Sequence, residues 1–166
     1  MTEPGSSTSA TAIEIDSESV NAVVLDYGNV LYAWEPMAAV AGHVSEEDWE
    51  EFVADGNFLA WNERLDLGEP FEQVLADYAR AHPDLPDWTE IFALYRERFT
   101  ASLTGPVPGM ASVLDDLLEA GVVLYGLTNF DSSLFEQARL LVPQLEQFAG
   151  IVVSGREHLA KPDAAI

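Results

Sequence analysis

The sequence predicts an α/β protein with a Rossmann-like parallel sheet and an inserted all-helical block. Three short apolar runs, at residues 20–25, 122–127 and 151–153, have the composition of strands, and amphipathic helical patterns separate them. Strands that alternate with helices predict parallel pairing through right-handed crossovers. Between the first two runs, residues 35–103 are helical in period and predict the insert, so the core is expected at residues 20–34 and 104–166.

The first core segment follows a tail. Residues 1–19 are rich in Ser, Thr, Glu and Ala, which is typical of disorder. The first strand contains the run Val23-Val24-Leu25 and is expected to be buried. The pair Glu35-Pro36 interrupts the chain because the residue before a proline avoids helical geometry.

Four helices are expected in the insert. Ser45 is a good N-cap for the first, and the second ends near Gly68. The third begins at Pro70, which suits a first helical turn. The fourth begins at Asp87 or Thr89.

After the insert, a helix ending at Gly121 leads to the second strand, residues 122–127. The uninterrupted apolar character of this strand predicts burial on both faces of the sheet. Asp131 or Ser132 caps the next helix, and a short turn leads to the third strand.

Composition limits the possible functions. The chain of 166 residues has no Cys, which excludes disulfides, a thiolate nucleophile and Cys-ligated zinc. Its 29 acidic and 7 basic residues give a net charge of -22, which argues against nucleic acid and anionic membranes as partners. No apolar run has the length of a membrane span and no signal pattern is present, so the cytoplasm is the expected location.

Each predicted strand is followed by polar groups. Asp26 follows the first strand, Thr128 and Asn129 follow the second, and Lys161 comes shortly after the third. The carboxyl ends of parallel strands meet at one edge of a sheet, so these groups are expected together. A carboxylate nucleophile with a hydroxyl, amides and one ammonium suits phosphoryl transfer. Singly, the same residues also fit a turn, a capping loop and a solvated lysine.

The joint pattern resembles the haloacid dehalogenase (HAD) superfamily of hydrolases, in the branch with a helical cap and an Asp-x-Gly-Asn pattern. The likeness extends over about residues 20–166. It lies in four stretches of sequence: LDYGNVL at residues 25–31, LTN at 127–129, SGREHLAKPD at 154–163, and the cap-like WNERLDLGE at 61–69.

The resemblance implies a mechanism and a cofactor. Asp26 would be the nucleophile that forms an aspartyl-phosphate and would also bind Mg²⁺, with the Gly28 carbonyl as a second metal contact. Thr128 and Asn129 would hold the phosphoryl group, and Lys161 would pair with it and with Asp26. The implied function is a Mg²⁺-dependent phosphatase of a small phosphorylated metabolite, such as a sugar phosphate.

The chain departs from the family pattern at two places. Gly28 stands where most phosphatases of the superfamily have a second Asp that transfers protons, so water, Glu63 or Asp66 would have to serve. The fourth motif, an acidic strand end that completes the Mg²⁺ site, is absent. The expected core therefore lacks its C-terminal strands, which leaves the first strand at an unpaired edge open to self-association.

Two other functions stay open at this point. One is a 2-haloacid dehalogenase, in which Asp26 attacks carbon of a halogenated metabolite without a metal. The other is a non-catalytic HAD remnant that binds a phosphorylated ligand or a partner, which the absent fourth motif favours. Arg64 and Arg156 are candidate anion-binding helpers, although salt bridges within so acidic a chain are the simpler interpretation.

Overall fold

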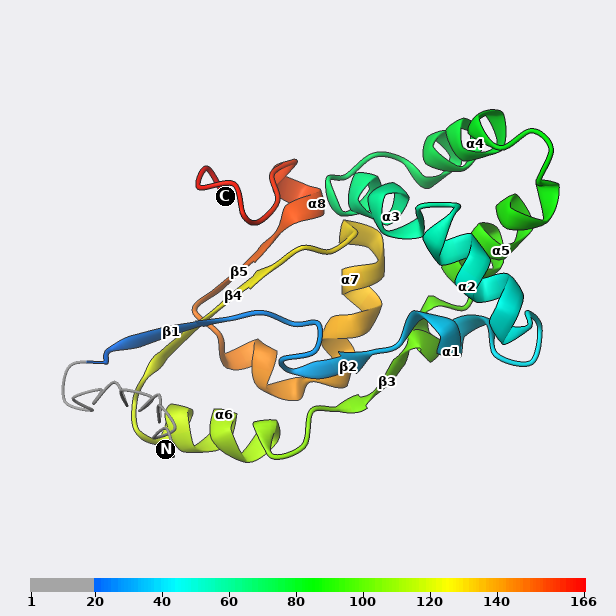
Figure 1. The fold of residues 1–166 in the computed structure, drawn as a ribbon. Helices are drawn as coiled ribbons and strands as arrows, with labels where there is room; N and C mark the ends of the chain where they lie inside the picture. Colours follow the sequence, from blue (N-terminus) through cyan, green and yellow to red (C-terminus); the bar gives the residue numbers. More distant parts are fainter. Residues whose placement is uncertain (1–19) are drawn as a thin grey trace, which may run out of the picture.

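The computed structural model describes residues 20–166, and the tail predicted at residues 1–19 lies outside the described residues. Strands β1 (Ala22–Leu25), β4 (Val123–Thr128) and β5 (Gly150–Val153) form a parallel sheet in the order β1-β4-β5 (Figure 1). The predicted α/β fold, with a Rossmann-like core and a helical insertion, is confirmed. Within the described residues β1 is an edge strand, paired with β4 alone.

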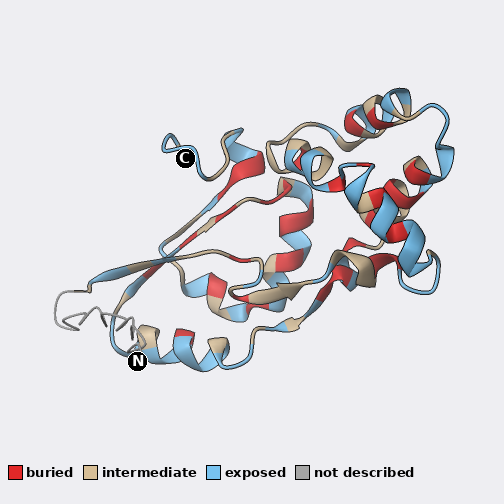
Figure 2. Ribbon diagram, in the orientation of Figure 1, coloured by how far each residue is buried: buried red, intermediate tan, exposed pale blue. Residues whose placement is uncertain are grey.

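Only one face of this sheet is covered in the described part of the chain. Along β4, Leu124 and Thr128 are buried whereas Val123 and Tyr125 are exposed, and Val24, the register partner of Tyr125 on β1, is 61% exposed (Figure 2). The predictions that the first strand is buried and that the second is buried on both faces are therefore wrong. An apolar run shows that a strand packs well, but it does not show how many layers cover it.

A second, two-stranded sheet joins the core to the insert. Strand β2 (Tyr32–Trp34) pairs antiparallel with β3 (Leu103–Pro106), and Glu35 N–H donates to the Ser102 carbonyl beyond the ribbon. The sequence does not predict this pair of strands. Strand β2 has only three residues and β3 contains a Gly-Pro pair, so neither has a clear strand pattern. The second sheet brings the two connections to the insert side by side (Figure 1).

The insert contains the four expected helices, α2 (Glu46–Ala54), α3 (Phe58–Asp66), α4 (Phe71–Ala81) and α5 (Pro86–Glu97). A fifth helix, α1 (Pro36–Val40), was not predicted, and the 3-10 helix η1 (Phe99–Ser102) follows α5. The Ser45 hydroxyl accepts from the Asp48 N–H, which confirms Ser45 as an N-cap. Helix α5 begins at Pro86, one residue before Asp87 and three before Thr89, the two predicted starts, because the fixed φ of proline suits the first turn.

An aromatic cluster forms the core of the insert. Phe58 is buried and its ring lies against those of Trp49, Phe52, Phe92 and Tyr95, at centroid distances between 4.9 and 6.0 Å. Figure 2 shows buried segments on the facing sides of α2, α3, α4 and α5. The insert therefore has a hydrophobic core of its own; the domain boundaries at residues 34/35 and 103/104 stay a prediction.

The rest of the core follows the insert. It comprises α6 (Met110–Glu119), α7 (Ser132–Ala138), the 3-10 helices η2 (Arg139–Leu141) and η3 (Pro143–Gln147), and α8 (Ser154–Glu157). Of the two predicted caps of α7, Asp131 and Ser132, the structure has Asp131, which accepts from the Ser133 and Leu134 N–H groups. Figure 1 shows the carboxyl ends of β4 and β5 directed toward the insert. No helix among residues 20–166 is long and apolar enough to span a membrane.

Candidate active site

Asp26 lies directly after β1 and both of its carboxylate oxygens are engaged. Oδ1 accepts from the N–H of Tyr27 at 2.7 Å, and Oδ2 lies 2.7 Å from the ammonium of Lys161. The Asp26 side chain is nevertheless 39% exposed, so a ligand can approach it. A carboxylate held in one orientation at an open strand end is suited to act as a nucleophile or a metal ligand.

The loop after Asp26 is fixed by its own residues. The Tyr27 ring is buried, and its hydroxyl donates to the Ala138 carbonyl of α7 at 2.7 Å; this burial raises the pKa of the phenol. Asn29 has a φ of 58°, in the left-handed region that Asn tolerates, and its side chain accepts from the Trp34 N–H. The loop therefore turns away into β2 while Asp26 and Gly28 stay at the edge of the sheet.

Lys161, the single lysine of the sequence, is positioned by contacts with three other residues. Its ammonium contacts Asp26 and donates to the Leu127 carbonyl at the end of β4, 2.9 Å away. Its backbone N–H donates to the Asn129 side-chain oxygen, while the Asn129 side-chain amide donates to the Lys161 carbonyl. The predicted juxtaposition of Asp26, Asn129 and Lys161 is thus present in the structure.

The other predicted residues have distinct surroundings. Thr128 is the last residue of β4 and is 2% exposed, and Gly28 lies two residues beyond Asp26. Sequence reasoning expected Asn129 to hold the substrate, but its side chain is occupied by the backbone of Lys161. No sequence pattern predicts this pair of hydrogen bonds between Asn129 and Lys161, because the two residues are 32 positions apart. The Asn129 side chain therefore positions Lys161.

The donor set at Asp26 fits Mg²⁺ only in part. Among residues 20–166 no group of three His or acidic side chains is placed to hold a metal ion. The Gly28 carbonyl lies in the loop after Asp26. No backbone N–H of residues 20–166 donates to it, so its oxygen can bind a metal ion. Mg²⁺ commonly binds one or two carboxylates together with waters and substrate phosphates. Asp26 and Gly28 fit such shared coordination, with the substrate supplying the further oxygens.

A cavity of about 80 Å³ lies between the loop after β1 and the insert. Gly28 and Asn129 line it from the core, and Asp66 and Asn62 line it from α3. Its remaining lining is mostly aromatic or aliphatic: Trp34, Tyr95, Phe99, Leu103, Phe130 and Leu134, with Asp131. Asp26, Thr128 and Lys161 are not among its lining residues, so the cavity lies beside the Asp26–Lys161 pair and reaches it through Gly28 and Asn129.

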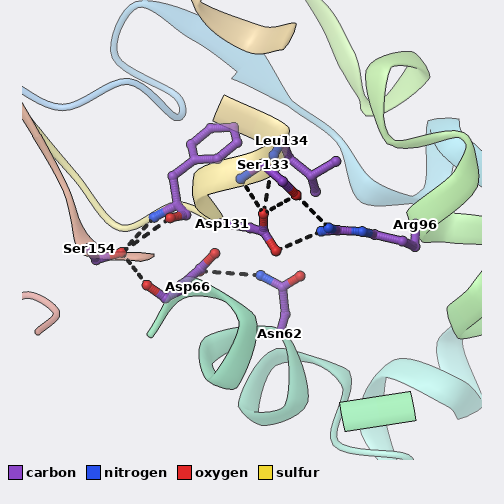
Figure 3. A network of polar contacts seen from close by, with 8 residues as sticks. Asn62, Asp66, Arg96, Asp131, Ser133, Leu134 and Ser154 are labelled. Carbon is purple, nitrogen blue, oxygen red and sulfur yellow. Dashed lines mark hydrogen bonds and ion pairs between the residues drawn. The ribbon is translucent and has the colours of Figure 1, made fainter. Parts of the chain in front are cut away.

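A polar network joins the insert to the core beside this cavity (Figure 3). Arg96 of α5 donates to Asp131 Oδ2 at 2.8 Å and to the Ser133 hydroxyl at 2.7 Å. Across from them, the Asp66 carboxylate accepts from the Asn62 amide at 3.3 Å. The hydroxyl of Ser154, at the start of α8, donates to the Asp66 carbonyl.

The two acids of this network have opposite protonation behaviour. Burial and the negative charge of Asp131 raise the pKa of Asp66 to about 7. Burial acts in the same direction on Asp131, but hydrogen bonds from Ser133 and Arg96 outweigh it and hold the pKa of Asp131 below its usual value. Near neutral pH the cavity thus has one carboxyl group that can carry a proton beside one that is ionised.

The chain is similar to a phosphatase. Sesquiterpene phosphatase astK of Aspergillus oryzae is 27% identical over 149 residues, which cover 86% of this chain and 68% of the relative. No family model matches the chain.

Other charged and hollow regions lie away from Asp26. Arg64 pairs with Glu69 and Asp77, and Arg156 pairs with Glu136, so the salt-bridge interpretation of both arginines is confirmed. A larger hollow of about 690 Å³ is lined only by residues 43–97 of the insert and by none of the predicted site residues.

Proposed function

We propose that this protein is a HAD-type, Mg²⁺-dependent phosphatase that hydrolyses phosphate monoesters of small alcohols through an aspartyl-phosphate. The observation that carries the proposal is the 2.7 Å contact between Asp26 and Lys161 at the carboxyl edge of the sheet. Lys161 is the one lysine in a chain of net charge -22. The ammonium that an anionic substrate needs is therefore held beside the carboxylate that attacks it.

The residues divide the chemistry between them. Asp26 attacks phosphorus, the bond to the alcohol oxygen breaks, and water then releases phosphate from the Asp26 acyl-phosphate. The Lys161 ammonium contacts the transferred oxygens and offsets their repulsion from Asp26. Thr128 and the Asn129 backbone N–H contact the same oxygens. When bound by Asp26 and the Gly28 carbonyl, Mg²⁺ supplies positive charge that stabilises the phosphoryl oxygens.

The cavity lining favours an apolar alcohol over a sugar. Six of its side chains are aromatic or aliphatic, whereas Asn62, Asp66, Asn129 and Asp131 are its polar side chains. A sugar would leave several hydroxyl groups against apolar surface without hydrogen-bond partners, which is costly. The similar protein astK is a sesquiterpene phosphatase, so we propose an isoprenoid monophosphate as the first ester to test.

The test is phosphate release from farnesyl phosphate and glucose 1-phosphate, measured with Mg²⁺ and with EDTA. We expect Mg²⁺-dependent release, faster from farnesyl phosphate, that Asp26→Asn reduces by at least about a thousandfold, because a carboxamide does not form the covalent intermediate. Asp55→Asn, an exposed acid at the end of α2, is the matched control and should behave as the native chain. Equal phosphate release by the native chain and by Asp26→Asn would show that Asp26 is not the nucleophile.

A further inference from the structure

Asp66 is the last residue of α3, and the core holds this end of the helix firmly. The Ser154 hydroxyl donates to the Asp66 carbonyl, and the His158 ring nitrogen Nδ1 lies 2.9 Å from the Leu67 carbonyl. Gly68 packs so closely on α8 that an added Cβ would lie 2.6 Å from the Gly155 carbonyl. The carboxyl group of Asp66 is therefore placed by the core as well as by the insert.

Of the two acids that the sequence offers for proton transfer, only Asp66 shares a cavity with the nucleophile loop. Its side chain lines the cavity together with Gly28 and Asn129. Glu63, one turn earlier on α3, is exposed and is not part of that lining. The geometry thus distinguishes two residues that sequence spacing alone does not.

Burial and the acidic groups around Asp66 favour its protonated form. Asp131 at the start of α7 and Glu63 on α3 add negative charge, whereas Arg96 of α5 opposes them and is itself paired with Asp131. Tyr95 of α5, which lines the same cavity, stays a neutral phenol because burial raises its pKa. With a pKa of about 7, Asp66 can give up and recover a proton near neutral pH.

We propose that Asp66 is the general acid and base of the reaction, the role that Gly28 leaves vacant in the nucleophile loop. This assignment rests on the proposed phosphatase function. As Asp26 bonds to phosphorus and the phosphorus–alkoxide bond breaks, the proton of the Asp66 carboxyl group passes to the leaving oxygen and forms the alcohol. The Asp66 carboxylate then takes a proton from the water that attacks phosphorus, the bond to Asp26 breaks, and both carboxyl groups return to their starting states.

The test compares two esters of nearly equal size that differ in their need for an acid. The 4-nitrophenolate of 4-nitrophenyl phosphate leaves without protonation, whereas the alkoxide of 4-nitrobenzyl phosphate requires it. In Asp66→Asn, the ratio of benzyl to phenyl ester turnover is expected to fall by about 10²–10⁴, the usual contribution of a positioned acid. Glu72→Gln, which changes an exposed acid on α4 away from the cavity, is the matched control and should leave the ratio at its native value.

A pH profile and a folding control complete the experiment. Native turnover of the benzyl ester should fall as pH rises through about 7, and this limb should be missing in Asp66→Asn. The urea midpoint of Asp66→Asn at pH 8 should equal or exceed the native one, because a carboxyl group whose pKa is raised by folding costs stability once it ionises.

The outcomes separate this assignment from the function on which it rests. An unchanged ester ratio in Asp66→Asn, with both esters still hydrolysed, would overturn the role of Asp66 alone. An equal loss of turnover with both esters would also overturn the general acid–base role. Asp66 would then only position other groups. Failure of the native chain to hydrolyse either ester would overturn the phosphatase proposal and Asp66 with it.

Discussion

The ion pair between Arg96 and Asp131 joins the insert to the core, and removing it should destabilise the protein measurably. The two side chains are 17% and 11% exposed, and their charged atoms are 2.8 Å apart. At that distance and an effective dielectric constant of about 20, the Coulomb attraction is about 6 kcal/mol. Desolvation of the two groups offsets most of this attraction, so the net contribution is much smaller.

Arg96→Met keeps the aliphatic part of the side chain and removes its polar contacts. The variant loses the bond to Asp131, the bond to the Ser133 hydroxyl and the stacking of the guanidinium over Phe71. Asp131 keeps its bonds to the first turn of α7, so one carboxylate oxygen stays satisfied. We expect a loss of about 2 kcal/mol in unfolding free energy, typical of one charge-assisted hydrogen bond left unmade.

Urea unfolding at pH 7 measures this loss, and a thermal scan should show a Tm lower by roughly 4–8 °C for a domain of this size. The pKa of Asp131 is lowered by folding, so its stabilisation is present above the ordinary Asp pKa of about 3.9 and disappears as pH falls below it. The difference in unfolding free energy between the native chain and Arg96→Met should therefore shrink below about pH 4.

The control is Arg80→Met. Arg80 is 74% exposed and pairs with Asp77, so its replacement should cost at most about 0.5 kcal/mol in unfolding free energy. Equal losses in Arg96→Met and Arg80→Met would refute this account of the junction.

Two further predictions concern the sheet and the lysine. Leu124→Ala should cost about 2–5 kcal/mol in urea unfolding, whereas Val24→Ala on the opposite face should cost less than about 1 kcal/mol; similar costs would contradict the one-sided packing of the described sheet. An amine-reactive reagent can label only Lys161 and the chain N-terminus, and inorganic phosphate should slow labelling of Lys161 selectively, as read by peptide mass spectrometry. Labelling that phosphate leaves unchanged would show that no anion binds beside Lys161.

The sequence was most informative where a residue's role follows from its place along one strand or helix. Asp26 and Thr128 lie at the carboxyl ends of β1 and β4 as expected, because strand ends are marked by the change from apolar to polar residues. The N-cap of α7 was narrowed to Asp131 or Ser132 by their place just before its apolar stripe, and Asp131 is the cap. Ser45 and Pro70 marked the starts of α2 and α4 to within one residue. Pro86, the first residue of α5, was not recognised as a start, and Asp87 or Thr89 was predicted instead.

Pairings between distant residues could not be predicted in the same way. Asn129 hydrogen-bonds Lys161, and Arg96 pairs with Asp131. In both cases the partners are more than thirty positions apart, and their spacing follows no period of helix or strand. The exposed positions Val24 and Tyr125 were missed for a different reason: a uniformly apolar strand carries no mark of which face is covered. The protonation state of Asp66 likewise depends on tertiary neighbours and not on its own sequence context.

The central claim is that Asp26 becomes phosphorylated during turnover. The most direct measurement is a rapid acid quench of the native chain with farnesyl phosphate and Mg²⁺, followed by peptide mass spectrometry of the segment that contains Asp26. The account predicts one phosphoryl group on Asp26 in the native chain and none in Asp26→Asn. Phosphate release that proceeds without any phosphoryl group on Asp26, at the same rate in both chains, would contradict it.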